Sequence, residues 1–158
     1  MFDFLFIVKW YFFGRLKIGR KSRKKNAFSQ FNKALSKLNK GSYVIDCGAN
    51  VGEFTKLFLD KGFIVDAFEP DPIAVNELKK KCKKNKNLNL FQSAVGLKDN
   101  TQRLFRYRKF DENDPNSTQG SSLLDYRSGT NKPFVEIKVI DFINHINKQK
   151  KEISLLKM

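Results

Sequence analysis

The chain has 158 residues, of which 41% are hydrophobic and 30% charged, and its formal net charge at pH 7 is +15. This length permits one ordinary domain, and 16 phenylalanines supply apolar mass for a core, so global disorder and collagen-like repeats are excluded. No run of about 18 apolar residues occurs, which excludes a polytopic membrane protein.

Cysteine and histidine are scarce: the chain has Cys47, Cys82 and a single histidine, His145. These three residues cannot form a Cys/His zinc set, so we expect no metal site. Two isolated cysteines are typical of a reducing compartment and predict a cytoplasmic protein. His145 falls in a segment that predicts a surface helix, and no GxSxG motif is present to partner it, so we expect no catalytic role for it.

Positive charge is concentrated in two segments. Residues 1–40 contain eleven lysines and arginines and one acid, and six lysines lie between Lys79 and Lys86. One interpretation is attraction to phosphate, on nucleic acid or on anionic lipid. The other is a lysine-rich composition, with residues 79–86 forming a solvated helix face.

The N-terminal residues 1–26 are interpreted as a hydrophobic and basic extension of a domain over residues 27–158. The apolar run Phe2–Phe13 is broken by charged residues and is too short to cross a bilayer. Aromatic residues followed by basic ones favour a helix on an anionic membrane surface, with residues 2–25 in contact. The alternatives are a helix packed on its own domain or on a second subunit, or disorder.

Residues 27–96 predict alternating helices and strands. Apolar spacing indicates a helix over residues 27–39, and the strand–turn–helix pattern then repeats. This order predicts an α/β fold with a Rossmann-like parallel sheet, in which strands two and three lie on one side of strand one. The expected elements are strands over 43–45, 63–68 and 88–91, a helix over 53–61 closed by Gly62, and a helix capped by Asp71 that begins at Pro72.

The last third predicts further elements. We expect an added strand over 101–108, a polar loop over 111–120 and a strand over 133–140. A short helix over 141–147 and a fourth parallel strand over 153–158 follow.

Small and polar residues follow the predicted parallel strands, at the edge of the sheet where ligands bind. The turn after strand one does not have the GxGxxG pattern of dinucleotide-binding proteins. The carboxylate of Asp46 at this turn would repel a pyrophosphate but attract an ammonium or sulfonium group. Glu69 lies 21 residues beyond Gly48, the spacing of a carboxylate that accepts ribose hydroxyls. A ligand with ribose and positive charge but no phosphate is S-adenosylmethionine. The candidate residues are Asp46, Gly48, Asn50 and Gly52 after strand one, Glu69 after strand two, and Ser93 and Ala94 after strand three.

Three segments, VIDCGANVGEFT, FEPDP and QSAVG, occur in an order and spacing that resemble the FkbM-type methyltransferases of the class I, Rossmann-like superfamily. The resemblance covers residues 40–158. It implies that the backbone of Gly48–Gly52 borders the methionine part of S-adenosylmethionine. It also implies that Asp46 holds the cofactor's amino group, directly or through water, and that Glu69 holds the ribose.

The same resemblance implies an adenine site. Pro70 and Asp71 would flank the adenine. Ser93 and Ala94 would close its far side.

The resemblance also implies an incomplete domain. The family sheet has seven strands and this sequence supplies about four, so we expect a truncated chain or one completed by a second polypeptide. Strand four would then be an exposed apolar edge, with weak cofactor binding and doubtful catalysis.

We therefore expect methyl transfer to a hydroxyl of a sugar, glycan or small natural product, with no residue assigned as catalytic base. One alternative is an RNA methyltransferase, suggested by the net charge; the lysine runs lack interleaved aromatic residues, so nucleic acid is the less favoured partner. The other alternative is a non-catalytic remnant or interaction module.

Overall fold

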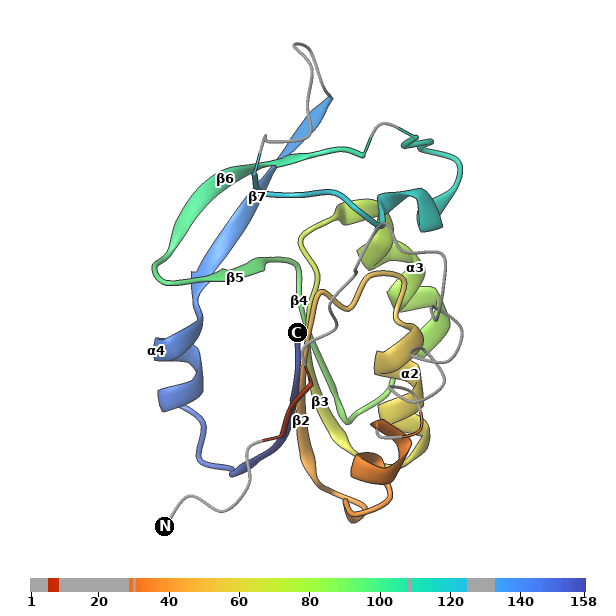
Figure 1. The fold of residues 1–158 in the computed structure, drawn as a ribbon, viewed down its shortest axis with the longest axis vertical. Coiled ribbons are helices and arrows are strands. Elements are labelled where there is room, and N and C mark those ends of the chain that lie inside the picture. The colour runs from red at the N-terminus through yellow and green to blue at the C-terminus, as the bar shows by residue number, and fades with distance from the viewer. Residues whose placement is uncertain (1–5, 9–28, 30, 108, 125–132) are drawn as a thin grey trace, which may run out of the picture.

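Two β-sheets organise residues 6–8, 29, 31–107, 109–124 and 133–158, the part of the chain that the computed structural model describes (Figure 1). The larger sheet is parallel, with the order β1–β8–β2–β3–β4, and the smaller has the order β5–β7–β6. The expected α/β fold with a parallel sheet is therefore confirmed. The strands of the larger sheet are β1 (Phe6–Val8), β2 (Tyr43–Cys47), β3 (Ile64–Phe68), β4 (Leu88–Phe91) and β8 (Ile153–Lys157).

The topology of the larger sheet brings three strand ends together. β3 and β4 lie on one side of β2, as right-handed crossovers predict, and β8 lies on the other side. Asp46 of β2 pairs with Ala67 of β3 and with Lys157 of β8. Because all these strands run in one direction, their carboxyl ends form a single edge.

Helices cover both faces of this sheet. α2 (Glu53–Asp60) and α3 (Pro72–Cys82) lie on one face, and α4 (Phe142–Asn147) lies on the other (Figure 1). The alternation along β2 fits this arrangement: Val44 belongs to the core on the α2–α3 side, whereas Tyr43 and Ile45 belong to the core beside Phe142. Each face of the sheet thus has its own apolar core.

The helix ends have the local causes that the sequence indicates. The Asp71 side chain accepts the Ile73 N–H at 3.0 Å and Pro72 occupies the first turn, so α3 begins where predicted. Gly62 follows α2 with φ +77, and its N–H donates to the Leu59 carbonyl at 2.9 Å.

The predicted helix over residues 27–39 is shorter in the structure. Residues 31–35 are helical, and Phe31 and Leu35 are buried in the core. Residues 27, 28 and 30 lie outside the described residues.

The smaller sheet is built from strands within residues 94–141. β6 (Asn100–Phe105) runs antiparallel to β7 (Phe134–Asp141), which confirms both predicted strands, and β5 (Ala94–Gly96) pairs parallel to β7. No strand was predicted over residues 94–96, where β5 forms. The predicted polar loop contains a 3₁₀ turn, η1 (Pro115–Thr118).

The sequence predicts an N-terminal helix, and this prediction is wrong at residues 6–8, where the chain forms the strand β1. β1 pairs parallel to β8 from Phe6–Leu155 to Val8–Lys157. The residue types of β1, one aromatic and two β-branched, favour a strand, and β8 offers an edge of unpaired backbone groups. The expectation that strand four is an exposed edge is therefore also wrong; the rest of residues 1–26 lies outside the described residues.

His145 does not lie on a simple surface helix, contrary to the sequence-based expectation. Its side chain is 15% exposed, and its Nε2 lies 3.0 Å from the buried carboxylate of Asp66. Tyr43 Oη donates to the same carboxylate at 2.6 Å, and Asn89 Nδ2 donates to it at 2.8 Å. Helical periodicity did not reveal this pairing, because the partners come from β2, β3 and β4.

Among the described residues, no helix has the length and hydrophobicity needed to cross a bilayer.

Candidate functional site

The turn after β2 presents bare backbone at the carboxyl edge of the sheet. The N–H groups of Gly48 and Ala49 both donate to the Phe68 carbonyl, at 2.9 and 3.0 Å, which fixes the turn to the end of β3. Asn50 adopts a left-handed conformation with φ +50. A Cβ added at Gly48 would meet nothing within 4 Å, so a ligand can approach the backbone there.

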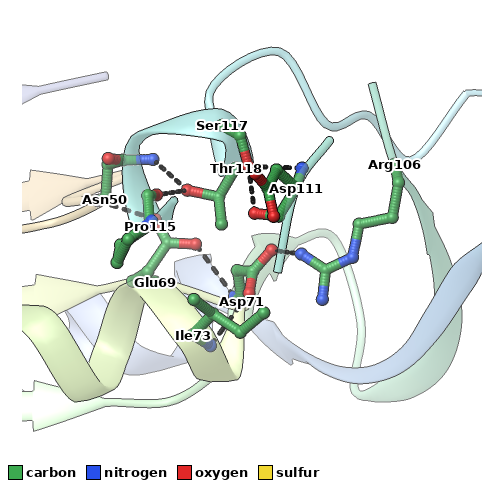
Figure 2. Close-up of polar contacts among 9 residues, drawn as sticks. All are labelled: Asn50, Glu69, Asp71, Ile73, Arg106, Asp111, Pro115, Ser117 and Thr118. Atoms are coloured by element: carbon green, nitrogen blue, oxygen red, sulfur yellow. Dashed lines mark hydrogen bonds and ion pairs between the residues drawn. The ribbon is translucent and has the colours of Figure 1, made fainter. Parts of the chain in front are cut away.

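Glu69 joins this turn to α3. Its Oε2 accepts the Asn50 N–H at 2.7 Å, and its Oε1 accepts the Asp71 N–H at 2.9 Å (Figure 2). The residue is 6% exposed. Burial raises the pKa of Glu69 to about 7, although the Asn50 N–H and the nearby charges of Lys157 and Arg106 act in the opposite direction.

Asp46 is fully buried on the α2 side of β2. One carboxylate oxygen accepts the Thr55 hydroxyl at 2.7 Å, and the other accepts the Lys157 ammonium at 2.7 Å. The resemblance implies that Asp46 contacts the amino group of the cofactor, and this role stays a prediction.

The predicted adenine side lies next to Glu69. The N–H groups of Ser93 and Glu69 both donate to the Phe91 carbonyl, at 2.9 and 3.1 Å. Ser93 is 4% exposed and its Oγ has no hydrogen-bond partner among the described residues. Pro70 is half-buried beside Glu69, and Ala94 is buried where β5 begins. The structure thus gathers the ends of the three predicted strands at one place.

Three side chains that were not predicted complete this edge. Thr118 of η1 accepts the Asn50 Nδ2 at 2.9 Å and donates to the Pro115 carbonyl at 2.7 Å (Figure 2). Arg106, which follows β6, forms a buried ion pair with Asp71.

The third is Lys157, whose position could have been found from the sequence. It lies at the carboxyl end of the predicted fourth strand, where the same rule that selected Glu69 applies. Arg106 and Thr118 reach the site through the second sheet and its long connection, for which the local sequence gives no signal.

The residues present fit a nucleoside. Each Glu69 oxygen accepts one N–H and retains capacity for one more donor, as a ribose diol requires. The unpartnered Ser93 Oγ offers a buried polar group to a base. The open backbone at Gly48 leaves space for the chain attached to the ribose.

Comparison with known proteins gives one family match. Residues 46–158 match the family described as Methyltransferase FkbM domain. No curated protein matches the chain.

Two solved structures are similar to part of the chain. One is a SAM-dependent methyltransferase from Geobacter sulfurreducens in complex with S-adenosyl-L-homocysteine, with 19% identity and a TM-score of 0.36 over 41% of this chain and 27% of that one. The other is a TehB-like SAM-dependent methyltransferase from Corynebacterium glutamicum, with 13% identity and a TM-score of 0.31 over 46% of this chain and 45% of that one. The aligned parts therefore span less than half the length of either protein.

Proposed function

The chain belongs to the methyltransferase FkbM domain family, and on that premise we propose that it binds S-adenosylmethionine at the carboxyl ends of β2, β3 and β4. We further propose that the methyl group goes to a hydroxyl oxygen of a sugar, glycan or small natural product. The observation that carries the proposal is Glu69, a buried carboxylate at the end of β3 that is fixed by two backbone N–H groups beside an open turn.

The ribose, the methionine part and the adenine of the cofactor each have a protein counterpart in this proposal. Glu69 accepts hydrogen bonds from the ribose hydroxyls, and the Gly48–Gly52 backbone borders the methionine part. Ser93 lies at the adenine, with Pro70 and Asp71 beside it. The bound cofactor supplies an electrophilic methyl group, and the chain's own residues hold and orient the reactants.

Calorimetric titration with S-adenosylmethionine tests the proposal. We expect Glu69→Gln to weaken binding by about tenfold or more, because a neutral amide cannot accept both ribose hydroxyls. The control is Glu152→Gln, which alters an exposed residue. A wild-type chain that gives no heat with either S-adenosylmethionine or S-adenosylhomocysteine would remove the cofactor site.

RNA is a second candidate acceptor because exposed lysines gather at the end of α3 and just beyond it. They are Lys79, Lys80, Lys83, Lys84 and Lys86. RNA gel shifts across a salt series distinguish this candidate, since phosphate contacts make affinity fall steeply with salt. If the chain does not bind RNA at low salt, RNA is excluded as the acceptor. If neither cofactor nor RNA binds, the remaining candidate is a non-catalytic interaction module.

We propose a cytoplasmic location, with peripheral membrane contact through residues 2–25. The location is supported by the two free, buried cysteines, which suit a reducing compartment. The membrane contact is supported by the aromatic and basic residue types of the segment. Sedimentation with anionic and with neutral lipid vesicles tests the contact, and equal partitioning to both would contradict it.

A further inference from the structure

Lys157 is a buried cation of the proposed cofactor site, and it lies on the β2 side of that site. It ends β8 and is 8% exposed, and its Nζ lies 2.7 Å from Asp46 Oδ1. The same Nζ lies 3.2 Å from the Gly48 carbonyl oxygen and 3.4 Å from that of Cys47. All of these acceptors belong to the end of β2 and the turn that follows.

These contacts occupy the whole ammonium group. An ammonium has three N–H donors, and the structure provides three acceptors for them. The second oxygen of Asp46 is occupied by Thr55 at 2.7 Å. Asp46 therefore receives its positive counter-charge from within the chain, through a buried ion pair.

Charge balance makes this pair important for ligand choice. S-adenosylmethionine carries a sulfonium, whereas S-adenosylhomocysteine has a neutral thioether and otherwise the same groups. A buried charge near the sulfur changes the affinity for the first ligand and hardly affects the second. Because the Gly48 carbonyl contacts Lys157, the ion pair lies directly behind the turn assigned to the methionine part.

We propose that Lys157 is a positioning and specificity-determining residue, which neutralises Asp46 and thereby sets how strongly the pocket prefers the sulfonium cofactor over its thioether product. The proposal rests on the function proposed above. In the wild-type chain the neutral pair adds little preference for the cation. A chain without the ammonium presents an uncompensated carboxylate and favours the cation.

The test is the ratio of the dissociation constants for S-adenosylhomocysteine and S-adenosylmethionine, measured by calorimetry on the full chain. We expect Lys157→Met to raise this ratio about fivefold, the effect of one uncompensated unit charge that a partly polar environment screens. Asp46→Asn leaves Lys157 unbalanced and is expected to lower the ratio by a similar factor. The double variant Asp46→Asn/Lys157→Met is expected to return to the wild-type ratio.

Lys98→Met is the matched control, because Lys98 is exposed and its loss changes the net charge by the same amount. A role in folding alone would weaken both ligands equally and leave the ratio unchanged. If Lys157→Met fails to fold, Asp46→Asn still tests the proposal, because it is expected to lower the ratio of the two dissociation constants. Ratios in these variants within twofold of wild type, with both ligands still bound, would overturn the proposal. A wild-type chain that binds neither ligand removes the proposed function itself.

Discussion

At the scale of single residues, Glu69 combines burial with two backbone hydrogen bonds. Burial raises its pKa to about 7, and the Asn50 N–H opposes that shift only in part. The carboxylate is thus ionised only near and above neutral pH. Only the ionised form offers acceptors to both hydroxyls of a ribose.

We therefore predict that cofactor affinity increases with pH up to about pH 7. At pH 6, one unit below the pKa of Glu69, the ionised fraction is roughly one tenth, so affinity should be about tenfold lower than at pH 8. Calorimetry across this range measures the effect, and Glu69→Gln should abolish the pH dependence. If the affinity of Glu69→Gln for the cofactor depends on pH as in the wild type, another group causes that dependence.

The same shift predicts how stability without ligand depends on pH. The folded-state pKa of Glu69 is raised above its ordinary value of 4.5. Between these two pH values the folded chain binds more protons than the unfolded chain, so this residue makes stability fall as pH rises from about 4.5 to 7. Urea unfolding of wild type and Glu69→Gln across this window checks the sign: the difference between them should grow in favour of the variant.

Gly52 is a second residue whose identity the backbone requires. Its φ is +83, and a Cβ there would lie 2.8 Å from Leu78 Cγ. We expect Gly52→Ala to lower the free energy of unfolding by about 2–4 kcal/mol, from backbone strain and overpacking together. Gly48→Ala is the matched control: φ is +70 but the space is open, so about 1 kcal/mol is expected. Urea denaturation followed by circular dichroism compares the two, and equal losses would contradict the role of Leu78.

At the scale of elements, residues 111–118, which lie between β6 and β7, contact the turn after β2, and we expect them to cap a ligand bound at Glu69. Asp111 and Asp114 each accept the N–H two residues ahead, at 2.9 and 3.0 Å, so the segment is ordered by its own side chains. It holds Thr118 against Asn50 beside Glu69 (Figure 2). Any ligand on Glu69 lies next to this segment.

We predict that Thr118→Val speeds cofactor dissociation about fivefold. The variant keeps the shape but loses the hydrogen bonds to Asn50 Nδ2 and to the Pro115 carbonyl, each worth about 1 kcal/mol; the first of these holds the segment against the turn after β2. Stopped-flow displacement measures the rate, with the exposed Thr101→Val as control. If Thr118→Val instead binds the cofactor more tightly, the segment competes with the ligand and does not cap it.

The sequence predicted the elements whose causes are local. The apolar runs of β2, β3 and β4, the Asp71 cap and Gly62 act within a few residues, and each is found where expected. Contacts between distant segments were missed. β1 is a strand because β8 has a free edge, and Arg106 reaches Asp71 because β6 and β7 pair. No periodicity encodes such pairings.

The candidate site shows the same difference between local signals, which the sequence contains, and contacts between distant segments, which it does not reveal. The residues after each parallel strand could be predicted because the topology of a parallel sheet brings strand ends together. The same rule also places Lys157 at this edge, but it does not predict its pairing with Asp46, because that pairing requires β8 to lie beside β2. Its identification needed the order of the strands as well as their existence.

At the scale of the whole molecule, a buried polar network joins α4 to the larger sheet. Asp66 of β3 accepts from Tyr43 of β2 and Asn89 of β4, and it contacts His145 of α4. α4 directly follows β7, so this network also attaches the smaller sheet to the larger one. Removing a donor weakens contacts among segments that lie far apart in the sequence.

We predict that Tyr43→Phe lowers the free energy of unfolding by about 1–2 kcal/mol, because the Asp66 carboxylate loses a buried donor while packing is conserved. Tyr107→Phe, at a residue that is 39% exposed, should cost less than about 0.5 kcal/mol. Burial, with the bond to Asp66 adding to it, raises the pKa of the Tyr43 phenol. Spectrophotometric titration of the folded chain between pH 9 and 11 should therefore be unchanged by Tyr43→Phe. A variant whose titration loses one tyrosine in that range would show that Tyr43 is not held against Asp66 in solution.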